Sequence, residues 1–295
     1  MAATAAFSAC LGLPADEVDA EDEATDVALD DRARAASRCN TAAPFGPPLA
    51  VTELNSFARD EGARLSPDEL TLYFSSNRAG SQGGFDIYRA TRPSRTSPFL
   101  PPAAVAGVNT AADERSPTVT SNDRDLYLAT SATSSFDIAR AHRGNTGAPF
   151  GAPMPVAAIN SVGDDADPYV LPDHTAVYFA SARGGNWDLF RAARVGGATQ
   201  APVQIAGGPH VELAPVVSPD ELTLYFASSR PGGAGDLDIY IATRASTAQT
   251  FSAPVAVTGL NTTGADVPTW TSRDGCVLYY TRGETGDIFV ATRGR

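Results

Sequence analysis

The sequence predicts an all-β protein, a five-bladed β-propeller of four-stranded antiparallel blades. One unit recurs five times, and the aspartates that mark it follow one another at a nearly constant spacing. Short runs of β-branched and aromatic residues alternate with clusters of Gly, Pro and Asp, which is typical of β-hairpins. The marker residues are Asp86, Asp137, Asp188, Asp238 and Asp287. A fixed period near 50 residues with several short strands in each unit is the signature of a propeller.

The clearest copy of the unit is residues 218–244, SPDELTLYFASSRPGGAGDLDIYIATR. It reads as a turn, a strand, a Gly-rich loop and a second strand, and the turn has Pro at its second position. Further copies begin at Ser66, Thr120, Leu171 and Ser272. We expect these hairpins to form the two central strands of each blade.

A proline-containing segment between the hairpins predicts the outer strand, because a missing N–H costs little at a sheet edge. The chain opens with such a segment, FGPPLAVTELN from Phe45, and ends at Arg295 after a third strand. Five hairpins therefore have five outer strands only if residues 45–55 complete the last blade and cover its edge. We expect residues 44–295 to form this domain.

The net charge of −12 is concentrated in residues 16–31, which hold nine acids and no base. The remainder carries −12 + 9 = −3, so nothing favours nucleic-acid binding. Residues 1–43 are expected to be a truncated signal remnant followed by an acidic, disordered tether. An acidic docking tail is the alternative for this run.

The stretch from Phe7 to Cys10 resembles the end of a bacterial lipoprotein signal, where a Cys is cleaved and acylated. The basic region is absent and the apolar region is short, which fits a true start further upstream. Cys10 is therefore the lipidation candidate, and membrane contact is expected only through such an anchor. A chance Ala-rich start is the alternative.

Cys39 and Cys276 lie far apart in the sequence. Strand direction alternates within a blade, so the start of the second strand and the start of the fourth lie at the same end. The loop of Cys39 can thus reach Cys276. The two cysteines are expected either to form a disulfide or to remain as two free thiols. His142, His174 and His210 are scattered, and no metal site is predicted.

The pattern SPD-x-x-x-LYF-x-S-x-R, then a Gly-rich loop, then D-[IL]-[YF]-x-A-[TA]-R resembles the TolB-type, WD-like (PD40) β-propeller repeat of bacterial envelope proteins. The resemblance covers residues 45–295 and implies the propeller fold with a protein partner at the channel mouth. The second copy departs from it, because TSND replaces SPDE and Ala132 stands where other copies have Arg.

Two sets of repeated polar residues accompany this pattern. We expect the loop arginines to pair with the hairpin aspartates across each hairpin, a structural role since every blade needs it. These arginines are Arg78, Arg183, Arg230 and Arg282. Five acids before the inner strands would form a negative funnel at the channel mouth for a basic peptide or a cation such as calcium, unless they only cap local turns. They are Glu61, Glu114, Asp165, Glu212 and Asp266.

Aromatic residues that break the repeat are further binding candidates, because structure alone does not demand them. They are Trp187, Phe85, Phe136 and Trp270. Exposed rings would stack on a sugar or a peptide, whereas buried rings would wedge between blades.

The function predicted is that of a non-catalytic binding or scaffold propeller of the bacterial cell envelope. We expect an exported monomer, periplasmic or anchored to the outer membrane, which binds an envelope protein or peptide and needs no cofactor. The alternative is a carbohydrate-binding or glycoside-hydrolase-like propeller of sialidase or arabinanase type, with a glycan as ligand. No catalytic triad, Walker loop or dinucleotide fingerprint is present to favour another enzyme class.

Overall fold

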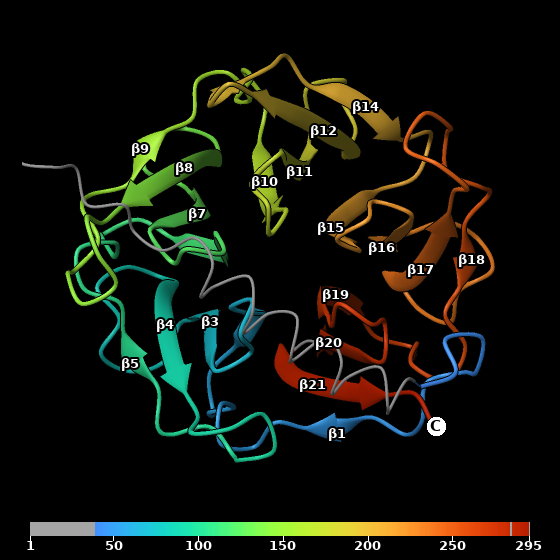
Figure 1. Ribbon diagram of the computed structural model, residues 1–295, viewed down its shortest axis with the longest axis horizontal. Helices are drawn as coiled ribbons and strands as arrows, with labels where there is room; N and C mark the ends of the chain where they lie inside the picture. Colours follow the sequence, from blue (N-terminus) through green and yellow to red (C-terminus); the bar gives the residue numbers. More distant parts are fainter. Residues whose placement is uncertain (1–38, 284, 295) are drawn as a thin grey trace, which may run out of the picture. The chain divides into compact units, whose positions relative to one another are not determined.

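The computed structural model describes residues 39–283 and 285–294, and these residues form only β-strands, turns and loops. The strands build five separate sheets that stand around a common centre (Figure 1). This arrangement is the predicted five-bladed propeller. Cys10 and residues 1–38 lie outside the described residues, and no helix long and apolar enough to cross a membrane is found within the described ones.

Each blade contains an inner strand, two central strands and an outer strand. The first blade comprises β2 (Asp60–Leu65), β3 (Thr71–Ser76), β4 (Asp86–Thr91) and β5 (Ala103–Ala104). The second comprises β6 (Glu114–Val119), β7 (Asp125–Thr130), β8 (Asp137–His142) and β9 (Met154–Pro155). The fourth comprises β15 (Glu212–Val217), β16 (Thr223–Ser228), β17 (Asp238–Thr243) and β18 (Val255–Ala256).

The third blade has an irregular outer part. It comprises β10 (Asp165–Val170), β11 (Ala176–Ser181), β12 (Asp188–Val195) and β14 (Val203–Ala206), and the short strand β13 (Ala198–Thr199) extends the end of β12. With four residues, β14 is longer than the two-residue outer strands of the other blades. This difference becomes important at the boundary between the third and fourth blades.

The fifth blade joins the two ends of the domain. Its strands are β19 (Asp266–Thr271), β20 (Val277–Arg282), β21 (Asp287–Thr292) and β1 (Leu49–Ala50). Leu49 pairs with Val290 and Ala50 with Phe289 in antiparallel register. The predicted closure of the last blade by the first strand is therefore confirmed.

A disulfide joins Cys39 to Cys276 beside this closing pair, with the two Cα atoms 5.7 Å apart. Cys276 immediately precedes β20, and Cys39 lies on the segment that leads to β1, so both cysteines lie at the same end of the blade. A backbone hydrogen bond from the amide of Asn40 to the carbonyl of Gly294, 3.1 Å long, holds the same segment. The ring is thus closed by main-chain pairing and by a covalent bond.

The hydrophobic core lies between the blades. Aromatic side chains on the second strands are fully buried, among them Phe74, Phe179, Phe226 and Tyr280. Each belongs to a cluster that also contains residues of a neighbouring blade. Because no blade buries its apolar faces by itself, the domain is stable only as a closed ring.

We expect the loss of the disulfide to destabilise the domain without changing its fold. The bond closes a loop with a sequence separation of 237 residues, so its removal frees the unfolded chain. The Cys39→Ala/Cys276→Ala variant should lose about 2–5 kcal/mol of unfolding free energy, measured by urea titration. Reductant should lower the unfolding midpoint of the unmodified protein and leave that of the variant unchanged. Equal midpoints for both proteins in oxidising buffer would contradict this account.

Candidate functional site at the mouth of the central channel

The inner strand of every blade begins with a buried acid. These acids are Asp60, Glu114, Asp165, Glu212 and Asp266, each 0% exposed. Four of the five acids predicted to form an open negative funnel are thus enclosed by protein, and that expectation is wrong. A fully buried carboxylate persists only with hydrogen-bonding or charged partners.

The partners are the repeated arginines. In the third blade, Nη2 of Arg183 lies 2.9 Å from Oδ1 of Asp165, and Nε donates to Oγ of Ser181 over 2.8 Å. The same guanidinium donates to the carbonyl of Ile159, which follows the outer strand of the second blade. The pairs Arg78–Asp60, Arg230–Glu212 and Arg282–Asp266 repeat the ion pair. Each arginine therefore binds the inner strand of its blade, and three of the four also bind the preceding blade.

The predicted pairing of these arginines with the hairpin aspartates is also wrong. Each guanidinium is held inward between aromatic rings of its blade, as Arg183 is by Phe179 and Phe190. The aspartates instead accept hydrogen bonds within their own loops or from the adjoining outer segment. Asp86 accepts from the amides of Gln82 and Gly83. Asp137, Asp188, Asp238 and Asp287 have comparable partners.

The second blade lacks the arginine, because Ala132 occupies its position. Glu114 accepts hydrogen bonds from the amide and hydroxyl of Thr110 and from the hydroxyl of Thr130. These neutral donors do not offset the loss of water, so burial raises the pKa of Glu114 above its ordinary value.

Glu61 lies one position after the repeated acid, whose counterpart in the first blade is Asp60. It is therefore on the other face of its strand, where it bridges Arg59 and Arg115. Its carboxylate lies 3.2 Å from Nη2 of Arg59 and 3.0 Å from Nη1 of Arg115. Arg115 also contacts Asp113 over 2.8 Å. Burial raises the pKa of Glu61, and the two arginines oppose this rise.

A β-bulge interrupts the inner strand of each blade next to these charges. Ser116, Asp167 and Ala214 there adopt positive φ angles of 51°, 52° and 51°, which cost energy for residues other than glycine. Asp167 accepts a hydrogen bond of 2.6 Å from the hydroxyl of Ser116 and one of 3.0 Å from the amide of Ala214. One carboxylate thus connects the second, third and fourth blades across the mouth.

Each inner strand carries a buried side chain at its fifth position, and these are Arg64, Thr118, Tyr169, Val216 and Trp270. Arg64 reaches from the first blade to the third, where Nη1 donates to the carbonyl of Pro168 over 2.7 Å and the guanidinium lies 4.8 Å from the centre of the Tyr169 ring. Burial lowers the pKa of Arg64 to about 10, so this side chain stays charged at pH 7. We refer to this layer as the channel plug.

The four candidate aromatics are not an open stacking platform. Phe85 and Trp270 are buried, and Trp270 packs edge-on against Tyr279. Trp187 is half-buried against the core, and Phe136 is half-buried. The guanidinium of Arg115 lies 3.7 Å from the centre of the Phe85 ring and 5.7 Å from that of Phe136. Phe85 and Phe136 thus pack against a charged residue of the mouth, whereas Trp187 and Trp270 pack against the core.

Two of the three histidines bond within the second and third blades. His142 bonds to Asp125, and His174 bonds to the hydroxyl of Tyr127 in another part of the second and third blades. Among the described residues, no group of three or more His, Cys, Asp or Glu side chains is arranged to hold a metal ion. Calcium at the predicted acid ring would have to displace the arginines. The network around Glu61 was not predicted from the sequence. Glu61 was grouped with the acids that begin the other inner strands, although Asp60 is their counterpart and Glu61 lies one residue later.

No protein-family model matches the sequence, and no curated protein matches it. Similar folds occur among solved structures. TolB from Acinetobacter baumannii is 14% identical with a TM-score of 0.53, over 97% of this chain and 72% of that chain. An α-L-arabinofuranosidase from Podospora anserina is 12% identical with a TM-score of 0.54, over 87% and 98%. A gluconolactonase from Xanthomonas campestris is 12% identical with a TM-score of 0.52, over 82% and 74%. At these identities the likeness establishes the propeller fold alone.

We expect the buried ion pairs to contribute strongly to stability. Arg183→Ala leaves the carboxylate of Asp165 without its charged partner and should cost about 3 kcal/mol in urea unfolding. The control Arg124→Ala removes an exposed arginine from the turn between β6 and β7 and should change the unfolding free energy by about 0.5 kcal/mol or less. If Arg183→Ala lowered the unfolding free energy no more than Arg124→Ala does, the buried ion pair would not contribute to stability as expected.

Stability should also depend on pH through Glu114. Its pKa is raised on folding, so the stabilisation present below the unfolded value of 4.5 is lost as the pH rises through the folded value. As the pH rises from 4 to 7, the unfolding free energy of Glu114→Gln should therefore increase relative to that of the unmodified protein. Ala132→Arg, which supplies the arginine of the other blades, should reduce this pH dependence. Parallel pH profiles for all three proteins would contradict the assignment.

Proposed function

We propose that this protein is a non-catalytic binding propeller of the bacterial cell envelope, and that the mouth of its channel engages a protein or peptide partner. The resemblance of the repeat to the TolB-type propeller supports this role. The proposal includes export, with Cys10 as the point of lipid attachment and the acidic residues 16–31 as the tether. A cross-linking disulfide is compatible with an oxidising compartment.

The arrangement of charges at the mouth is the observation that carries the proposal. Glu61, Arg59, Arg115 and Asp113 form one network on the surface, with the channel plug beneath it. Both signs of charge are present, so the mouth suits a polar polypeptide surface better than a simple cation. This network departs from the repeat, because the positions equivalent to Glu61 and Arg115 in the other blades are apolar or small.

Exposed apolar side chains lie on the same face of the ring. Phe57 and Val162 occupy equivalent positions on the loops that enter β2 and β10, and both are fully exposed. An exposed Phe beside a paired Arg and Glu is a combination that protein interfaces favour, with an apolar anchor and a polar rim. This surface supports docking of a folded or extended polypeptide.

Two cavities lie away from the mouth. One of about 180 Å³ lies between the third and fourth blades, and another of about 370 Å³ lies beside Phe45 and Arg293. Neither includes Glu61, Arg115 or Asp167. Hydrolases bind sugars in a cleft with two carboxylates in unlike environments, and neither of these two cavities contains the acids of the mouth.

A glycoside hydrolase is the second candidate, and one observation favours it. Glu61 and Asp167 interact across the mouth, and Asp167 contributes to the raised pKa of Glu61. Asp167 itself accepts two hydrogen bonds, from the hydroxyl of Ser116 and from the amide of Ala214. Two carboxyl groups in unlike environments at one site are what glycoside cleavage requires.

Binding should depend on the mouth and not on the opposite face. With the full chain as bait and a bacterial envelope extract, Arg115→Ala and Phe57→Ser should each reduce capture of the identified partner about tenfold, equivalent to about 1.4 kcal/mol. Arg124→Ala, which also removes one arginine but on the far side of the second blade, should leave capture unchanged.

Partner capture that survives both mouth variants would contradict this proposal. Hydrolysis of nitrophenyl arabinofuranosides or other nitrophenyl glycosides would instead support the second candidate, provided that Glu61→Gln and Asp167→Asn abolish it. Hydrolysis that persists in both variants would exclude the mouth as the active site.

A further inference from the structure

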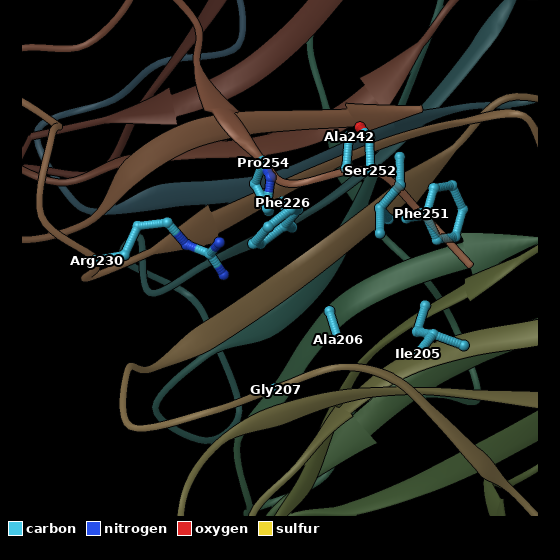
Figure 2. A pocket seen from close by; sticks show the side chains of 10 residues that line it. Ile205, Ala206, Gly207, Phe226, Arg230, Ala242, Phe251, Ser252 and Pro254 are labelled. Atoms are coloured by element: carbon cyan, nitrogen blue, oxygen red, sulfur yellow. The ribbon is translucent and has the colours of Figure 1, made fainter. Parts of the chain in front are cut away.

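A cavity of about 180 Å³ lies at the seam between the third and fourth blades. Figure 2 shows Ile205, Ala206 and Gly207 on one wall and Phe226 and Pro254 on the other. Arg230 lies at one end of it, with its guanidinium directed along the cavity. The cavity opens to solvent at Gly207, which is exposed.

The other four seams contain an aliphatic side chain at this place. It belongs to the residue before the asparagine that ends each outer segment, and the four residues are Leu54, Val108, Ile159 and Leu260, each 0–1% exposed. Leu54, for example, shares a cluster with Leu72, Phe74, Ala90 and Phe99. The equivalents of these neighbours, Leu224, Phe226, Ala242 and Phe251, line the cavity.

The third blade lacks this aliphatic residue because its connection to the next inner strand is shorter. Residues 259–266 read GLNTTGAD before the fifth blade, whereas residues 207–212 read GGPHVE before the fourth. The shorter connection has two residues fewer and contains no counterpart of the Leu-Asn-Thr sequence. Instead β14 continues its pairing with β12 as far as Ala206 opposite Leu189.

Two polar partners are lost with the aliphatic residue. Arg78, Arg183 and Arg282 each donate to the carbonyl of that residue, whereas the terminal nitrogens of Arg230 bond only to Glu212 among the described residues. The threonine or serine two positions later donates its amide to the second oxygen of the acid, as Thr262 does to Oδ2 of Asp266 over 2.6 Å. Oε2 of Glu212 is buried and accepts no hydrogen bond from the described residues.

We propose that this cavity is a binding site for an extended peptide segment of a partner protein. The segment would supply an aliphatic side chain, the carbonyl of that residue and a backbone N–H two positions further on. The aliphatic side chain replaces the missing Leu in contact with Phe226, the carbonyl accepts from Arg230, and the N–H donates to Glu212. The site is separate from the channel mouth and does not depend on the function proposed for it.

The size and polarity of the cavity fit this occupant. Its volume is several times the roughly 30 Å³ that a water molecule occupies in the liquid, enough for one branched aliphatic side chain and part of its backbone. The burial of Glu212 raises its pKa, and a peptide N–H would stabilise its charged form. A neutral apolar ligand would leave both Arg230 and Glu212 without these additional partners.

The test uses the full chain and a probe taken from its own repeat. The acetylated and amidated peptide of residues 257–265, VTGLNTTGA, carries the missing Leu-Asn-Thr step. In isothermal titration calorimetry it should bind saturably below about 1 mM, and the same peptide with Leu260→Ser should bind at least tenfold more weakly. The pair of peptides requires no change to the protein, so the result does not depend on a variant folding.

A pair of protein variants locates the site. Ala206→Leu places an aliphatic side chain in the cavity wall and should weaken peptide binding at least tenfold. Ala106→Leu makes the same change at the equivalent position of the seam that Val108 fills, and it should bind the peptide as the unmodified protein does. Equal binding of the two peptides, undiminished binding by folded Ala206→Leu, or no binding of either peptide would overturn the proposal.

Discussion

The buried contact between an arginine and the acid of an inner strand is the interaction on which the rest of the ring depends. The guanidinium of Arg183 joins Asp165 of its own blade to the carbonyl of Ile159 at the end of the previous one. It thereby ties neighbouring blades together, and the repeated carboxylate is occupied by a partner from within the ring. Because the arginines engage these acids within the ring, the function proposed for the channel mouth rests on the positions that follow them on the strand.

The sequence predicted the fold well and the site only in part. Periodicity revealed the blades, and the unequal numbers of hairpins and outer strands revealed the closure by β1 and the proximity of Cys39 to Cys276. Neither signal reports which way a side chain points. Glu61 and Asp60 are adjacent acids, and a shift of one residue decides which of them faces the mouth. The partner of each arginine was missed for a related reason, because a hairpin pattern describes contacts along a strand pair and says nothing of contacts toward the preceding blade.

The positions where blades differ carry the distinctive chemistry of this molecule. Arg64 in the first blade and Tyr169 in the third close the channel, although the repeat itself does not require either residue. Asp167 joins three blades at a strained bulge, which fixes a carboxylate in the mouth at the expense of backbone energy. The likeness to solved structures establishes the fold alone and does not decide between binding and catalysis. The distinction rests on these few inner-strand side chains.

The pairing of β1 with β21 has a consequence for biosynthesis. Asn55 bonds to both backbone groups of Ile288, a residue 233 positions later. On a ribosome that adds about 5–20 residues per second, the N-terminal strand waits roughly 10–50 seconds for its partner. During that time β1 has no strand to pair with, and the blade that it completes has not yet formed. The domain therefore acquires its final cooperativity only after β21 has been synthesised and has paired with β1.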